Sequence, residues 1–225
     1  MELEPEPLVA LRDVGLRRGG VAILDRVEFT LGPGLFALVG ANGSGKSTLL
    51  RALAGLIMPA RGSIMIAGHD LWRDGVAARR ALGYMPESPE FFPTLAPHEL
   101  LGLVASVRGV SPEPGRERFI HWVGAPALDL RIAMLSAGQR RKLALSLALI
   151  GDPRVLLLDE PINTLDAAAI VDLRGLLRER REAGCCVIVA IHQAASLALD
   201  FEGWLRVADG EVSCQVGPEA ASMPP

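Results

Sequence analysis

The chain has 225 residues, of which 50% are hydrophobic and 22% are charged, and its formal net charge is −3. This length is sufficient to bury a sizeable core, which excludes a disordered chain and a small disulfide-stabilised protein. The weak negative charge argues against a nucleic-acid-binding domain, which is usually basic, so no nucleic-acid partner is expected. The spacing of the three cysteines matches neither a disulfide framework nor a metal site. We expect all three to be small buried side chains in a protein of a reducing compartment.

A mean hydropathy of +0.31 raises the question of a membrane span, which needs about 20 consecutive, mostly apolar residues. The longest charge-free run worth testing covers residues 183–199, and polar residues interrupt it. The N-terminus is acidic and proline-rich, whereas a signal peptide places basic residues before an apolar run. We therefore expect a cytoplasmic protein, with flexible ends at residues 1–7 and 216–225.

The first third of the chain combines short β-rich stretches with one glycine-rich loop. Strands are predicted over residues 8–14, 27–31 and 35–39, and the loop then opens a helix over residues 46–54. Glycines on either side of residues 63–66 mark a further strand there.

The middle of the chain, from about residue 87 to residue 135, differs from the rest in composition because it is rich in proline. Helical patterns cover residues 97–107 and 115–123, and a longer helix is predicted over residues 138–150. We interpret residues 87–135 as a mostly helical insertion.

The last third alternates apolar strands with helices. Strands are predicted over residues 155–158 and 185–191, with an amphipathic helix over 167–183 between them. A hairpin follows, with strands over residues 204–208 and 211–215 joined by an Asp-Gly turn. Because the core strands lack polar–apolar alternation and are separated by helices, the sequence predicts a parallel sheet covered on both faces.

The glycine-rich loop at residues 40–48 matches G-x-x-x-x-G-K-[ST] between an apolar strand and a helix. Its glycines let backbone N–H groups face a phosphate, and the helix adds its positive N-terminal end. Lys46 is expected to reach the β- and γ-phosphates, and the Ser47 hydroxyl to bind Mg²⁺. A glycine turn without a ligand is the alternative, and the flanking strand and helix disfavour it. The nucleotide-binding residues predicted in this loop are Gly40, Asn42, Gly43, Ser44, Gly45, Lys46, Ser47 and Thr48.

Two acids, Asp159 and Glu160, follow the apolar strand at residues 155–158. Ligands of parallel sheets bind at the carboxyl ends of the strands. We expect Asp159 to hold the Mg²⁺ shell and Glu160 to orient or deprotonate the attacking water. An Asp-Glu pair could also serve only as a loop cap, but its occurrence with the phosphate loop favours the catalytic interpretation.

The segment at residues 135–139, LSAGQ, resembles the LSGGQ signature of ATP-binding-cassette (ABC) ATPases, with Ala137 in place of a glycine. Together with the phosphate loop and the acidic strand, the resemblance covers residues 8 to 212. It implies an α/β fold of the P-loop NTPase, ABC ATPase type, over residues 8–215. The expected parts are a mixed sheet core, an N-terminal antiparallel β subdomain and a helical subdomain at about 87–135.

The resemblance also implies partners and cofactors. Ser136, Gly138 and Gln139 would contact the nucleotide held by a second ABC subunit, identical or not, in a head-to-tail dimer around two ATP molecules with Mg²⁺. Residues 163–166 resemble the D-loop that connects the two sites. His192 matches the switch histidine that contacts the γ-phosphate.

Two positions depart from the family pattern. Glu87 stands where the family usually has a glutamine, and it keeps an oxygen ligand for Mg²⁺ or for the attacking water. The form Gly-Tyr-x-Pro-Glu at residues 83–87 resembles many bacterial export-type cassettes; a solvent-facing Glu87 is the alternative. Arg18 occupies the position where the family has an aromatic residue that stacks on adenine. Its guanidinium can stack on a base or can simply be solvated.

The predicted function is the ATPase subunit of an ABC transporter that powers transport, with export expected, through an integral membrane permease on a separate chain. The chain would then lie peripherally on the inner face of the membrane, docking near Glu87 and residues 91–101. The alternatives are a soluble ABC ATPase acting on nucleic acid or ribosomes, and a regulatory cassette of low activity. Basic clusters at residues 79–80, 140–142 and 178–181 are interpreted as solvated surfaces.

Overall fold

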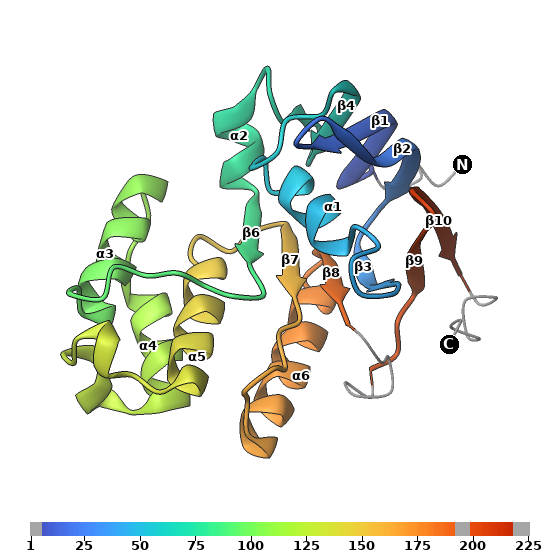
Figure 1. The fold of residues 1–225 in the computed structure, drawn as a ribbon. Coiled ribbons are helices and arrows are strands. Elements are labelled where there is room, and N and C mark those ends of the chain that lie inside the picture. The colour runs from blue at the N-terminus through green and yellow to red at the C-terminus, as the bar shows by residue number, and fades with distance from the viewer. Residues whose placement is uncertain (1–5, 192–198, 218–225) are drawn as a thin grey trace.

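A computed structural model of the chain describes residues 6–191 and 199–217, and its strands there form two sheets (Figure 1). The four-stranded sheet has the order β2-β1-β4-β5, and the six-stranded sheet has the order β10-β9-β3-β8-β7-β6. Most of the ends expected to be flexible, and His192, lie outside the described residues. The strands are β1 (Val9–Arg18), β2 (Val21–Leu31), β3 (Gly34–Val39), β4 (Arg61–Ile66), β5 (His69–Asp70), β6 (Leu82–Met85), β7 (Val155–Asp159), β8 (Cys186–Ala190), β9 (Gly203–Ala208) and β10 (Glu211–Val216).

Helices connect and cover these strands. They are α1 (Lys46–Leu53), α2 (Gly75–Arg80), α3 (Pro97–Arg108), α4 (Glu113–Val123), α5 (Ala137–Ala148) and α6 (Ala167–Glu182), with 3-10 helices η1 (Ala125–Leu128) and η2 (Ile132–Met134). Within the described ranges, none of the helices has the length and apolar character that a membrane span requires.

The smaller sheet is antiparallel, because β1 pairs in that sense with β2 and β4, and β4 with β5. Gly19 and Gly20 form the two-residue connection from β1 to β2 with positive φ angles of 56° and 83°. Positive φ at both positions is typical of the tight turn that matches strand twist. The antiparallel β part predicted for the beginning of the chain is confirmed.

The larger sheet is mixed. Strands β6, β7, β8, β3 and β9 run parallel to their neighbours, and β10 pairs antiparallel with β9. Every residue of β3, β7 and β8 is buried, because both faces of the sheet are covered. Along β7, Leu157 packs in the core cluster that contains α1, whereas Leu156 and Leu158 pack in the cluster that contains α5 and α6. The predicted two-sided sheet is therefore confirmed.

The helical group of α3, α4 and α5 lies to one side of the sheets (Figure 1). It has its own core cluster, in which Phe119 of α4 and Leu143 of α5 are fully buried. Ala144, Leu145 and Ala148 of α5 instead pack with the strands of the larger sheet. Helix α5 thus belongs to two cores, and it joins the helical group to the sheet.

Some details differ from the sequence predictions. Strands β1 and β2 are longer than predicted, and helix α2 and the edge strands β5 and β6 were not predicted, because all three are short. Of the cysteines expected to be buried, Cys185 and Cys186 are, but Cys214 is exposed on the edge strand β10. Arg141, expected on a solvated surface, is buried with a residual exposure of 6%.

Candidate nucleotide site

The loop between β3 and α1 has a backbone that only glycine adopts easily. Gly40, Gly43 and Gly45 have φ angles of 152°, 77° and 115°. A Cβ placed on Gly40 would lie 2.4 Å from the carbonyl oxygen of Val207, so a side chain has no room there. No side chain caps the start of α1 in the described structure, which leaves its first N–H groups for another acceptor. An anion such as a phosphate is the expected acceptor at such a helix end.

Lys46 places its charge at this loop. Its side chain is only 7% exposed, and its Nζ donates hydrogen bonds to the carbonyl oxygens of Gly40 at 2.7 Å and Ala41 at 3.2 Å. The ammonium group therefore spans the loop that a phosphate would enter. Ser44, also predicted to bind nucleotide, has a buried hydroxyl with no hydrogen-bond partner among the described residues.

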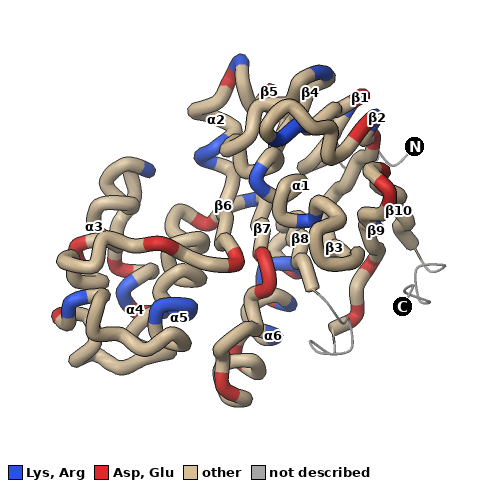
Figure 2. Tube along the Cα trace, in the orientation of Figure 1, with Lys and Arg blue, Asp and Glu red and all other residues tan. Residues whose placement is uncertain are grey.

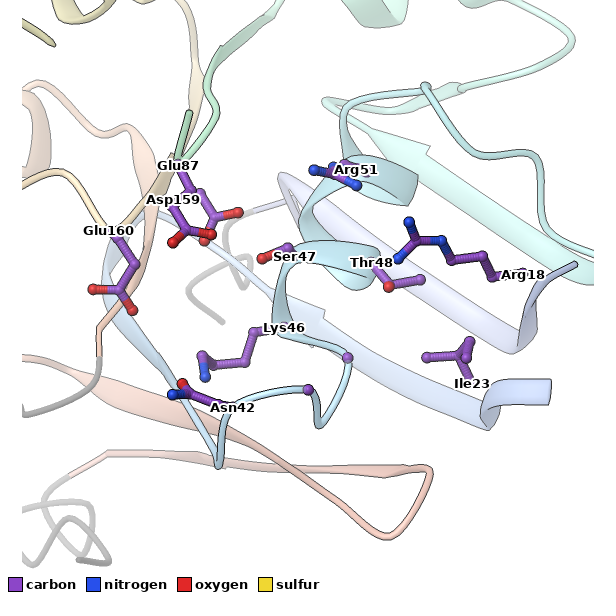
Figure 3. Close-up of a pocket in the computed structure, with 12 residues that line it drawn as sticks. Arg18, Ile23, Asn42, Lys46, Ser47, Thr48, Arg51, Glu87, Asp159 and Glu160 are labelled. Carbon is purple, nitrogen blue, oxygen red and sulfur yellow. The ribbon is translucent and has the colours of Figure 1, made fainter. Parts of the chain in front are cut away.

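Three carboxylates form the wall opposite the loop (Figure 3). Asp159 ends β7, Glu160 follows it, and Glu87 lies two residues beyond the end of β6. Because β6 and β7 are parallel, with Met85 opposite Leu158, the chain brings Glu87 alongside Glu160. Asp159 and Glu160 are 1% and 4% exposed, whereas Glu87 is exposed.

The Asp159 carboxyl has the environment of a cation ligand. Burial raises its pKa, the Ser47 hydroxyl opposes that shift by hydrogen bonding, and the charge of Glu87 raises the pKa further. Its Oδ2 atom is buried, and no described residue supplies a hydrogen-bond partner for it. A divalent cation would both satisfy this oxygen and favour the ionised carboxylate.

The donor set fits Mg²⁺, which prefers oxygen ligands and commonly binds through one or two carboxylates and substrate phosphates. Ser47 and Asp159 would hold it, with Glu87 beside them. The described residues contain no cluster of three or more His, Cys, Asp and Glu side chains that could hold a metal ion. The ligands named here are one carboxylate and one hydroxyl, with a second carboxylate beside them. Bound there, Mg²⁺ would neutralise charge on the β- and γ-phosphates.

One cavity of about 470 Å³ joins these features, a size typical of small-molecule sites. Figure 3 shows Arg18 and Ile23 at the end of the cavity away from the carboxylates. Sequence reasoning did not identify Ile23 or Arg51, although Arg51 lies one helical turn after Ser47 on α1 and so shares its face. The lining residues are Arg18, Ile23, Asn42, Gly43, Gly45, Lys46, Ser47, Thr48, Arg51, Glu87, Asp159 and Glu160.

The segment at residues 135–139 does not contribute to this cavity. Ser136 caps α5, because its Oγ accepts a hydrogen bond from Gln139 N at 3.2 Å and its N donates to Gln139 Oε1 at 2.8 Å. A Cβ on Gly138 would lie 2.9 Å from the carbonyl oxygen of Thr164, so the segment packs closely on residues 163–166. The start of α5 is thus held next to the loop that follows Glu160. His192 lies outside the described residues.

A phosphate loop at the end of β3, and acids at the end of β7, meet at one edge of a mainly parallel sheet. This combination defines the class of P-loop nucleoside triphosphatases. The comparisons with known proteins narrow the class. The family described as ABC transporter matches residues 24–163.

Curated relatives cover most of the chain. The cytochrome c biogenesis ATP-binding export protein CcmA of Cupriavidus necator is 34% identical over 86% of this chain and 88% of its own length. The zinc import ATP-binding protein ZnuC of Pseudomonas putida is 29% identical over 98% and 82%. The uncharacterized ABC transporter ATP-binding protein YhcH of Bacillus subtilis is 33% identical over 85% of this chain. The match covers only 64% of the length of YhcH.

A solved ATP-binding subunit of an ABC transporter has the same fold, with a TM-score of 0.85 and 27% identity over 93% of this chain and 90% of that one. The chain therefore belongs to the ABC transporter family, as an ATP-binding protein and an ATPase. The P-loop NTPase fold of ABC type, predicted from the sequence, is confirmed.

Proposed function

We propose that two copies of this chain pair head-to-tail around two ATP molecules, and that ATP binding and hydrolysis drive a separate membrane permease. The observation that carries the proposal is that Ser136, Gly138 and Gln139 lie outside the cavity that holds the phosphate loop. A helix N-terminus is suited to bind an anion. The start of α5 would therefore serve the nucleotide of a second copy.

In this proposal, residues of one copy bind the triphosphate and Mg²⁺, and Glu160 acts on the attacking water. Lys46 contacts the β- and γ-phosphates, and Ser47 and Asp159 hold the cation. Glu87 and His192 contact the cation, the water or the γ-phosphate. Arg18 lies at the cavity end where the base would bind, and its exposed guanidinium is free to stack on the adenine.

Replacing Glu160 with glutamine tests the catalytic assignment. The Glu160→Gln variant is expected to lose turnover by at least about 100-fold, because general-base catalysis contributes that order of rate. ATP binding should persist, since the loop and Asp159 are unchanged. With Mg²⁺ and ATP the variant should accumulate as a dimer in size-exclusion chromatography, and Lys46→Ala serves as the control that binds no ATP. Unchanged turnover in Glu160→Gln, or no ATP-dependent dimer, would contradict the proposal.

The membrane partner is proposed to dock on the helical group near Glu87. Phe92 is 66% exposed there, whereas its neighbour Phe91 packs partly against two core clusters. The same Glu160→Gln chain, purified with ATP from detergent-solubilised membranes, should bring an integral membrane protein with it. Phe92→Asp should weaken that co-purification without changing the ATP-dependent dimer.

We propose export as the direction. Two relatives with similar sequence identity to this chain are named for opposite directions, one for zinc import and one for export in cytochrome c biogenesis. Sequence similarity alone therefore does not decide the direction of transport. The Gly-Tyr-Met-Pro-Glu form of residues 83–87, which ends in Glu87, resembles export-type cassettes and supports export.

A further inference from the structure

Arg141 has a setting that the proposed function does not use. It lies on α5, is 6% exposed and does not line the nucleotide cavity. Its Nη1 atom is buried, and no described residue supplies a hydrogen-bond partner for it. Leaving a charged donor of this kind unpaired costs free energy unless nearby negative charge compensates for it.

The path of the chain places Arg141 behind the carboxylate wall. Helix α5 leads into β7 through a short connection, so it runs opposite to β7 and to the parallel strand β6. Its C-terminal end lies at the beginning of β6, where a Cβ on Gly83 would be 2.1 Å from the carbonyl oxygen of Ala148. The N-terminal part of α5 therefore lies near the other ends of β6 and β7, where the carboxylates follow.

Helical geometry supports the same placement. Arg141 precedes Ala148 by seven residues, or roughly 10 Å of helix, and Glu87 follows Gly83 by four residues, or roughly 13 Å of extended chain. Arg141 also shares a face of α5 with Ala144, Leu145 and Ala148, which pack on the sheet. Figure 2 shows the acidic residues that follow β6 and β7 as red segments beside the sheet.

The charges agree with this geometry. Burial lowers the pKa of the Arg141 guanidinium, and the negative charges of Glu87, Asp159 and Glu160 oppose that shift. Glu87 adds a carboxylate where a glutamine would be neutral. A buried cation behind three carboxylates offsets part of their charge and limits how they rearrange.

We propose that Arg141 is a positioning residue whose charge holds the carboxylates of Glu87, Asp159 and Glu160 and offsets the charge that Glu87 adds to the nucleotide site. This inference rests on the proposed function of that site. Arg141 lies on the helix whose first turn would contact the second copy's nucleotide. A shift of α5 on dimerisation would therefore also move the cation behind this copy's own carboxylates.

The sign of an electrostatic effect on Mg²⁺ separates this role from a structural one. Removing a cation near the metal ligands strengthens Mg²⁺ binding, whereas a packing defect weakens it or leaves it unchanged. In Arg141→Gln, the Mg²⁺ concentration that half-saturates binding of a fluorescent ATP analogue should fall about fivefold, while turnover should fall about tenfold. Arg141→Lys, which keeps the charge, should stay close to wild type in both measurements.

The Glu87→Gln variant allows a double-mutant cycle with Arg141→Gln. Alone, it should raise the half-saturating Mg²⁺ concentration, and combined with Arg141→Gln it should return that concentration close to the wild-type value. Arg178→Gln removes an arginine from an exposed position of α6 and is the matched control, with no expected change in Mg²⁺ dependence. Thermal melting of each variant shows that it is folded.

Two results would overturn the inference: an unchanged or higher half-saturating Mg²⁺ concentration in Arg141→Gln, or an Arg141→Lys variant as impaired as Arg141→Gln. Failure of the proposed function looks different. In that case Glu160→Gln would keep its turnover, while the Mg²⁺ dependence of nucleotide binding would still report on Arg141.

Discussion

Glu160 combines a buried carboxylate with a backbone conformation that is uncommon outside glycine. Its φ angle is 50°, and its N donates a hydrogen bond to the carbonyl oxygen of Ala190 on β8. Such a conformation costs of order 1 kcal/mol or more and persists where surrounding contacts over-determine it. The neighbouring strand therefore fixes the direction in which the carboxylate that we propose to act on the attacking water leaves the sheet.

Asp166 is the residue where a single charge should be visible in stability. Its Oδ1 accepts a hydrogen bond from Ala169 N and its Oδ2 pairs with Lys142 at 3.0 Å, and these two contacts lower its pKa from the ordinary 3.8. A lowered folded-state pKa contributes stability that is present above the ordinary value and is lost as pH falls through the lowered value.

Asp166→Asn keeps the helix cap and removes the charge, so it should be less stable than wild type at neutral pH. The difference should shrink as pH falls below the ordinary aspartate pKa and disappear once pH is below the lowered pKa of the folded state. Urea unfolding at a series of pH values measures it. Equal stability of the two proteins at every pH would show that the carboxylate charge contributes nothing.

Which site residues the sequence could reveal depends on how local their signal is. Lys46 and Ser47 follow from the phosphate-loop pattern, and Asp159 from its place after an apolar strand. Ile23 reaches the cavity only because β2 packs beside the loop, where its side chain would contact a Cβ on Gly45. Arg141 looks like any arginine of a charged helix, and only the packing of α5 on the sheet buries it. Non-local contacts of this kind leave no mark in one sequence.

Strand β6 and helix α5 form the contact that sets the position of Glu87. The two approach so closely at Gly83 that any side chain would meet the backbone of Ala148. Arg108, at the end of α3, donates hydrogen bonds to the carbonyl oxygen of Leu82 in β6 at 2.8 Å and to that of Ile150, two residues beyond α5, at 2.9 Å. Helix α3 is therefore bonded both to β6 and to the segment that follows α5. These contacts hold the helical group against the sheet close to the site.

Gly83→Ala should destabilise the protein by about 2 kcal/mol, because the added methyl forces β6 and α5 apart. Gly175→Ala is the matched control, since Gly175 is exposed on α6 with open space around its Cα. That change should stabilise the protein by about 0.5–1 kcal/mol through helix propensity. Urea unfolding of both variants checks the prediction, and equal effects of the two substitutions would contradict the close approach.

Elements with strong periodicity could be predicted from the sequence, and short elements could not. The strand that precedes the phosphate loop and the amphipathic helix α6 follow from apolar patterning. Strand β6 has four residues, one of them glycine, and α2 has six residues. Their stability comes from tertiary packing, which local propensity does not encode.

In the molecule as a whole, the two parts of the proposed nucleotide site do not meet within the described chain. The cavity holds the phosphate loop and the carboxylates, and the capped start of α5 lies outside it, against residues 163–166. A chain that carries both halves can complete two identical sites with a second copy, provided the interface has two-fold symmetry.

Mixing two inactive variants shows whether two copies share their nucleotide sites. Lys46→Ala lacks a competent phosphate loop and Ser136→Arg lacks a competent α5 start, so each variant alone should have almost no turnover. In an equal mixture that pairs at random, half of the dimers would contain one copy of each variant. Each mixed dimer would have one complete site, formed by the intact loop of one copy and the intact α5 start of the other. The mixture should therefore recover up to about a quarter of wild-type turnover. A mixture no more active than its separate components would contradict the head-to-tail dimer.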